Sequence, residues 1–150
     1  MYISLSVFLV HIITLCLTIS RIFFFIVLGH LDVVQFFMNS DEFTEVRNKR
    51  EETPLHLSSK GGYKDVVKFI FEKVTLKEPR DKNGAVPLHM ASFYGQLNVV
   101  KYLISVVDHK DPKNRFGYTP LHFAGILLIF SEILCVLKYT YYSTTKSNVP

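Results

Sequence analysis

The feature that most constrains this chain is an internal repeat with one fixed period, the interval from Pro54 to Pro87 and again from Pro87 to Pro120. The segment Thr-Pro-Leu-His-Leu at 53–57 recurs as Val-Pro-Leu-His-Met at 86–90 and as Thr-Pro-Leu-His-Phe at 119–123. A second pattern, Gly-x-x-Asp/Asn-Val-Val, recurs in the same register from 29, 62 and 95. Two motifs that share one period in three copies do not arise by chance, and such a period is typical of proteins built from stacked units.

The Pro-Leu-His motif predicts the start of a short first helix in each unit. Thr53 and Thr119 are placed as N-caps, whose hydroxyl groups accept from free amides and contribute about 1 kcal/mol each. Proline suits the first helical position, which needs no amide hydrogen. Val86 replaces the threonine in the middle unit, so we expect that helix to start less firmly. Gly62 and Gly95 are predicted to end the first helix with positive φ.

A second helix is predicted to open at Asp65 in one unit and at Asn98 in the next. Its apolar residues recur at i, i+1, i+4 and i+5, which makes a wide stripe suited to burial between units. Turns between units are predicted at 83–84 and 116–117, where a glycine follows Asn83 and Phe116. Each unit therefore consists of a helix, a turn, a second helix and an extended return.

These motifs resemble the ankyrin repeat, which has Thr-Pro-Leu-His-x-Ala at a period of about 33 residues. The resemblance covers residues 29–124 and gives two whole units, 48–80 and 81–113, between partial units at 29–47 and 114–124. It implies an all-α solenoid of stacked helix–turn–helix units, with β-turn fingers along its edge and a concave face that binds other proteins. The motif residues are expected to be structural, and they are Thr53, Pro54, Leu55 and His56, then Pro87, Leu88 and His89, then Thr119, Pro120, Leu121 and His122.

The chain departs from the family pattern at two kinds of position. Glu51 stands where a turn glycine is expected, which predicts backbone strain or a changed turn. The glycine usual after the second helix is replaced by Asp41, Val74 and Val107, so we expect those helix ends to fray or continue.

The two ends, 1–28 and 125–150, carry the apolar excess of the chain. Residues 1–28 hold 21 apolar residues and one charge, Arg21. An uncharged run of about 20 residues is long enough to cross a bilayer, and the position of Arg21 favours the repeats on the cytoplasmic side. One hypothesis is therefore a membrane anchor within residues 2–28, in an ankyrin protein or a fragment of a channel or receptor.

The alternative hypothesis is that both ends are translated non-coding sequence from a gene-model error around a fragment of a longer array. In the register of the repeat, however, residues 20–28 occupy the place of a first helix without its Pro-Leu-His motif. At the other end, residues 132–137 resemble a degenerate second helix displaced by one residue. Apolar helical ends are thus expected under either hypothesis.

Charge and histidine spacing argue against nucleic-acid, metal and catalytic chemistry. Residues 29–124 hold 14 Lys/Arg and 12 Asp/Glu in alternation, so they lack the gathered basic face of nucleic-acid-binding proteins. Cys16 and Cys135 make no metal spacing. His56, His89 and His122 occupy one position in successive units, and helices about 8–10 Å apart cannot share an ion with bonds of about 2 Å. Each histidine is instead expected to hydrogen-bond its unit to the next. With no catalytic or metal-binding pattern in the sequence, we predict that the protein is not an enzyme and has no cofactor.

The function predicted is a protein–protein interaction scaffold, favoured in the cytoplasm, with an unidentified protein partner. In the family pattern, finger residues and the exposed end of the first helix face the concave groove. The residues matched by register are Lys49, Arg50, Glu52 and Lys60 in one unit, Lys82, Asn83, Ala85, Phe93 and Tyr94 in the next, and Arg115, Phe116 and Tyr118 in the last. Aromatic and arginine anchors dominate interface energy, so the four aromatic residues are predicted partner anchors, or alternatively packing between units.

Overall fold

The computed structural model describes residues 20–38, 45–126 and 135–139, and the regular structure in these ranges is helical throughout. The helices are α2 (Leu31–Phe37), α3 (Pro54–Gly61), α4 (Lys64–Lys73), α5 (Pro87–Phe93), α6 (Leu97–Val106) and α7 (Pro120–Ile126). Residues 20–28 and 135–139 are helical as well. No helix within the described ranges is long and apolar enough to span a membrane, and most of the hypothesised anchor, residues 2–19, lies outside them.

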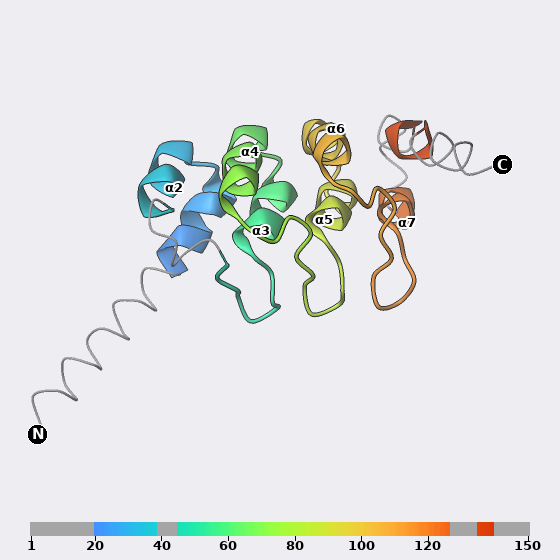
Figure 1. The fold of residues 1–150 in the computed structure, drawn as a ribbon, viewed down its shortest axis with the longest axis horizontal. Helices are drawn as coiled ribbons and strands as arrows, with labels where there is room; N and C mark the ends of the chain where they lie inside the picture. The colour runs from blue at the N-terminus through green and yellow to red at the C-terminus, as the bar shows by residue number, and fades with distance from the viewer. Residues whose placement is uncertain (1–19, 39–44, 127–134, 140–150) are drawn as a thin grey trace, which may run out of the picture.

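The helices stack in two layers, and long fingers extend from one side (Figure 1). The first helices α3, α5 and α7 contact one another in order, and the second helices α2, α4 and α6 form the other row. Helices α3 and α4 pair as one hairpin, and α5 and α6 pair as the next. The prediction of an all-α solenoid of stacked units is confirmed.

The core repeats with the same period as the motifs. Val34, Val67 and Val100, which lie one period apart, each have 0% of their surface exposed. Burying a side chain of this size contributes about 1.5–3 kcal/mol, so every unit adds a similar apolar layer to a continuous core. Ile22, one period before the buried Leu55, is also 0% exposed. The helix at 20–28 therefore packs in the place that the repeat register assigns to a first helix.

The motif leucines belong to this core to different degrees. Leu55 and Leu88 are 0% and 2% exposed, whereas Leu121 is only partly buried and packs against the same apolar cluster. Helix α5, which carries Leu88, is packed between α3 and α7, while α7 lies at the end of the row of first helices (Figure 1). The structural role expected of these leucines is thus fulfilled at Leu55 and Leu88, and Leu121 falls short of full burial because of its place in the stack.

Each first helix begins at its proline, as predicted, with Pro54, Pro87 and Pro120 at the first position. The N-cap amide of Thr53 donates to His56 Nδ1 at 3.1 Å, and the Thr53 hydroxyl lies 3.0 Å from the same nitrogen. In the next unit the amide of Val86 likewise donates to His89 Nδ1 at 3.2 Å, but valine has no hydroxyl group to make the second contact. The histidine thus serves the N-cap in both units.

The second helices begin one residue before the predicted positions, at Lys64 and Leu97, and Asp65 lies in the first turn of α4. They end where the missing glycine is expected: Val74 and Val107 have extended backbone, with ψ of 147° and 150°. The expectation that these helices continue is therefore wrong, and Asp41 lies outside the described residues. At α4 the ammonium group of Lys77 donates to the carbonyl of Val74 at 2.7 Å, which satisfies one of the free carbonyls at the helix end.

Candidate partner-binding groove

Each finger is closed by one asparagine or aspartate that lies outside the two repeated motifs. The Oδ1 atoms of Asn48, Asp81 and Asn114 each accept from the amides two and four residues later, at 2.8–3.0 Å. Such side-chain bonds to the backbone stabilise tight turns. These three residues share the spacing of the motifs, which was the signal available in the sequence.

The tip of each finger holds one residue with left-handed backbone. Gly84 and Gly117 have φ of 76° and 79°, as the predicted turns require, and Glu51 has φ of 60° in the equivalent place. A side chain in this region is strained by about 1–2 kcal/mol. The strain predicted at Glu51 is therefore present, and the turn keeps the shape of its glycine counterparts.

Neighbouring fingers are joined by backbone hydrogen bonds. The amide of Lys82 donates to the carbonyl of Arg50, and the amide of Arg115 donates to the carbonyl of Asn83, both at 2.9 Å. Arg47 Nη1 donates to the carbonyls of Glu51 and Arg80 at 2.9 and 2.8 Å. In the next unit Arg80 Nη1 repeats this arrangement with the carbonyls of Gly84 and Lys113, at 2.8 and 2.9 Å. The fingers thus form one connected edge.

A second ladder connects units just after the C-terminal ends of the second helices, where the chain leads into the fingers. Glu45 Oε1 accepts from the amide and hydroxyl of Thr75, at 3.2 and 3.0 Å. One unit later, Glu78 Oε2 lies 2.7 Å from His109 Nδ1, and this hydrogen bond raises the pKa of the exposed His109 above its ordinary value. These contacts explain the Glu-x-Arg pattern at 45–47 and 78–80, a third pattern with the period of the motifs.

The motif histidines link consecutive units, as predicted for His56 and His89. His56 Nε2 lies 3.0 Å from the carbonyl of Ala85, and His89 Nε2 lies 3.0 Å from that of Tyr118. A carbonyl only accepts, so Nε2 carries the hydrogen, while Nδ1 accepts from the N-cap amide. Burial also lowers the pKa of both histidines. Both therefore act as neutral structural links between units.

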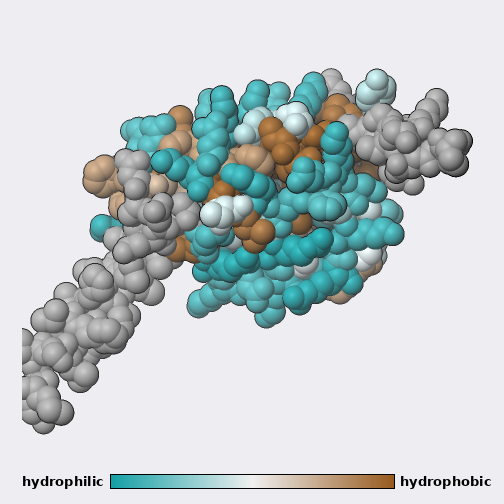
Figure 2. Space-filling view, viewed as in Figure 1, coloured by the Kyte–Doolittle hydropathy of each residue, from teal (hydrophilic) through white to brown (hydrophobic). Residues whose placement is uncertain are grey.

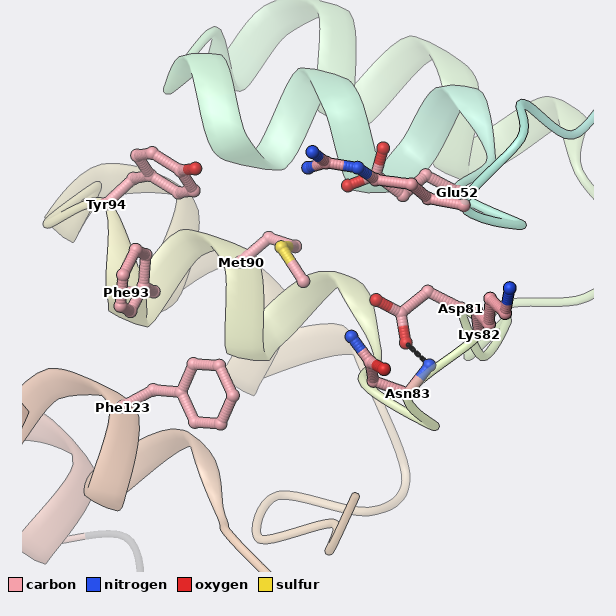
Figure 3. Close-up of a pocket in the computed structure, with 9 residues that line it drawn as sticks. Glu52, Asp81, Lys82, Asn83, Met90, Phe93, Tyr94 and Phe123 are labelled. Carbon is pink, nitrogen blue, oxygen red and sulfur yellow. Dashed lines mark hydrogen bonds between the residues drawn. The ribbon is translucent and has the colours of Figure 1, made fainter. Parts of the chain in front are cut away.

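A groove runs between the finger bases and the ends of the first helices. Figure 3 shows its two sides: Met90, Phe93, Tyr94 and Phe123 come from the helices, and Glu52, Asp81, Lys82 and Asn83 come from the fingers. Arg50 completes the lining. The region of the fingers is mostly hydrophilic in Figure 2. The groove therefore offers an apolar floor beside a charged wall.

The groove brings together half of the predicted partner residues: Arg50, Glu52, Lys82, Asn83, Phe93 and Tyr94. Glu52 is only 7% exposed, and its carboxylate accepts from Asn48 Nδ2 at 2.7 Å. The groove also includes Asp81, Met90 and Phe123, which the register match to the family pattern did not include.

The other six predicted residues lie outside the groove lining. Lys49, Arg115, Phe116 and Tyr118 are exposed on the fingers, and the Lys60 ammonium lies 4.8 Å from the centre of the Tyr94 ring. Ala85 is 1% exposed, so its prediction as a partner contact is wrong. The cause is the stacking itself, because the Ala85 carbonyl accepts from the histidine of the preceding unit.

The four aromatic residues divide between the two predicted roles. Phe93 is partly buried, and its ring contacts Phe123 of the next unit with centroids 5.8 Å apart, so it packs between units. Tyr94, Phe116 and Tyr118 are 40%, 69% and 49% exposed. These three rings remain available to a partner.

Among the described residues, no group of three or more His, Cys, Asp or Glu side chains is placed to hold a metal ion. What the fold and the groove define is a helical-repeat scaffold: a stack of similar units with a connected row of fingers beside a groove. A family model for ankyrin repeats in three copies matches residues 22–115 and, in a second match, residues 77–137. The chain belongs to the ankyrin-repeat family, whose members are typically non-catalytic protein–protein interaction domains. A search of curated proteins found no match.

Proposed function

We propose that this chain is a non-enzymatic interaction scaffold that holds a segment of a partner protein in the groove between its fingers and first helices. The observation that carries the proposal is the exposure of Tyr94, 40%, beside a floor built from Met90, Phe93 and Phe123. Large aromatic side chains at the edge of a concave, partly apolar surface are typical anchors of protein interfaces.

The rigidity of the groove supports the same proposal. Its finger wall is fixed by hydrogen bonds within each finger and between neighbouring fingers. Its floor is fixed by the ring contacts of Phe93 with Tyr94 and Phe123, at centroid distances of 5.1 and 5.8 Å. A preorganised surface loses less conformational entropy on binding, so more of the contact energy becomes affinity.

Peptide display against the full chain tests this proposal. Bound peptides are expected to shift the backbone NMR signals of groove residues, and replacing Tyr94 and Tyr118 with Ala is expected to reduce binding at least tenfold, about 1.4 kcal/mol. The control is Lys101→Ala on the exposed face of α6, which should leave binding unchanged. Circular dichroism must show that the double variant folds. The proposal fails if the folded double variant binds as tightly as the parent chain or if the shifts map to the second helices.

A further inference from the structure

We infer that the groove selects an acidic peptide segment that carries one large apolar or aromatic side chain. This inference rests on the proposed function and names the chemistry of its partner. Four cationic side chains stand exposed on three consecutive fingers, and they are Lys49, Arg50, Lys82 and Arg115. Their charged groups form no hydrogen bond or ion pair with the described part of the chain.

Several of the other basic residues are already occupied by contacts that hold the fold. The guanidinium groups of Arg47 and Arg80 bind finger carbonyls, and the Lys77 ammonium binds the end of α4. The Lys60 ammonium lies over the Tyr94 ring. The finger cations make no such internal contact, and they differ from the exposed Lys68 and Lys101 of the second helices in standing at or beside the groove, where a carboxylate ligand would pair with them.

The acidic residues of the fingers are placed to leave that positive edge largely uncompensated. Glu51 is the exposed carboxylate among the tip residues. Glu52 and Asp81 are 7% and 4% exposed at the finger bases, and each has one carboxylate oxygen engaged by a finger donor. The positive charge therefore lies at the rim, and the negative charge lies deeper in the groove.

This layering fits a peptide better than a nucleic acid. A peptide with acidic side chains toward the rim has backbone amides that can donate to the remaining oxygens of Glu52 and Asp81. A phosphate backbone that follows the same groove has no such donors and would meet those two carboxylates as like charges. Bases that stack on exposed rings are the competing arrangement, since Tyr94 and Phe116 could serve single-stranded nucleic acid.

The spacing of the fingers fits an extended segment. Stacked units lie about 8–10 Å apart, and an extended chain advances about 7 Å for every second residue. Acidic side chains two or three residues apart can therefore reach successive fingers. The apolar side chain between them would lie on the floor formed by Met90, Phe93, Tyr94 and Phe123.

The test uses fluorescence anisotropy with the full chain and a labelled peptide of about ten residues, in which Asp and Glu alternate with small residues around a central Phe. Matched probes replace Phe with Ala, or each acid with Lys, and a third is single-stranded oligothymidine. We expect the acidic Phe peptide to bind most tightly, and its affinity to fall when salt rises from about 0.05 to 0.3 M. Loss of the Phe ring should weaken binding about tenfold.

The charge contribution is isolated with Arg50→Gln combined with Lys82→Gln. This variant should bind the acidic peptide about five- to tenfold more weakly, as two exposed ion pairs suggest. The matched control is Lys68→Gln combined with Lys101→Gln, which removes the same charge from exposed positions on α4 and α6 and should leave affinity within twofold at the higher salt. Equal losses in the two variants would overturn the inference, because the effect would then be one of net charge alone.

Three further outcomes decide whether this inference, the proposed function or both stand. If peptide display selects neutral or basic segments that still map to the groove, the acidic preference is refuted and the scaffold function stands. If no peptide binds in the groove, both fail. If oligothymidine binds more tightly than the acidic peptide and depends on Arg50 and Lys82, the ligand is a nucleic acid and the inference is overturned.

Discussion

Replacing His56, which links two units, directly measures how much a contact between units contributes to the free energy of unfolding. The imidazole is 0% exposed, and it joins the N-cap amide of Thr53 to the carbonyl of Ala85, two residues that are themselves 1% exposed. Replacing His56 with Ala leaves the Thr53 amide buried without an acceptor, whereas the Ala85 carbonyl keeps only the bond from the Asp81 amide at 2.9 Å. An unsatisfied buried group costs about 1–3 kcal/mol.

Packing adds a second contribution to the loss. Removal of the ring leaves a cavity of about 60 Å³, which at about 24 cal/mol per Å³ costs about 1.5 kcal/mol. The free energy of unfolding should therefore fall by about 3–4 kcal/mol. His56→Gln should recover about 1 kcal/mol of this, because the amide of glutamine can donate to Ala85 although it leaves the Thr53 amide unpaired.

His122 provides a matched control within the same chain. Its Nδ1 accepts from the Thr119 amide at 3.2 Å, as in the other units, but its side chain is exposed and has no link to a following unit among the described residues. Water can replace what His122→Ala removes, so the expected loss is at most about 1 kcal/mol.

Urea denaturation of the full chain, followed by far-ultraviolet circular dichroism, measures these differences. The slope of free energy against urea concentration reports the surface exposed on unfolding, so it must be compared between variants before the midpoints are interpreted. The reasoning is refuted if His56→Ala and His122→Ala lower stability equally, because the link between units would then contribute nothing beyond the bonds within one unit.

Acid should destabilise the fold, since the pKa of buried His56 and His89 is lowered while the unfolded chain keeps a value near 6.5. Below about pH 6.5 the unfolded chain binds protons that the folded chain does not, so stability should fall by up to about 1.4 kcal/mol per pH unit per histidine, measured by urea titrations at pH 7.5 and 5.5. His109 opposes this, because its raised pKa gives stability that is full below about pH 6.5 and is lost as pH rises through the folded value, so His109→Gln should steepen the acid loss. Flat profiles in both the parent chain and His109→Gln would contradict both statements. Glu51→Gly should raise the melting temperature by relieving about 1 kcal/mol of strain at φ 60°. Gly84→Ala should lower it, because a Cβ there would meet Arg115 Cγ at 2.9 Å, and a stabilised Gly84→Ala chain would show that the left-handed turn is not required.

The sequence was sufficient for the scaffold because the scaffold repeats. The roles of Pro54, Gly62 and the motif histidines follow from the local preferences of helix caps and turns. Their shared period is enough to predict that the units stack. The finger closures by Asn48, Asp81 and Asn114 obey the same period, so they could have been found by comparing every register position. The ends of α4 and α6 could not be read in this way, since Val74 and Val107 have no intrinsic tendency to stop a helix.

The groove was harder to predict, because it depends on which side chains the stacking covers. Glu52 and Ala85 stand at one register position and are both buried, whereas Tyr118 at the same position is 49% exposed. Burial here is decided by the following finger, which is a tertiary effect that a single unit does not encode. Ala85 was misassigned for this reason, and Phe123 was missed because its exposure to the groove depends on the neighbouring Phe93.

A physical division between the two kinds of residue follows from the register. Positions that keep one residue type in successive units, such as the prolines and histidines of the motif, make the hydrogen bonds and apolar contacts that any stack requires. Positions that change type line the groove or its rim: Arg50 corresponds to Asn83 and Phe116, and Leu57 corresponds to Met90 and Phe123. Stacking needs the same contact at every interface, so it favours repetition, whereas one partner presents a different chemical group to each finger and favours difference. Under the proposed function, we expect departures from the period at exposed positions to set the specificity for a partner; they already account for the presence of a cationic rim and an aromatic floor on a regular scaffold.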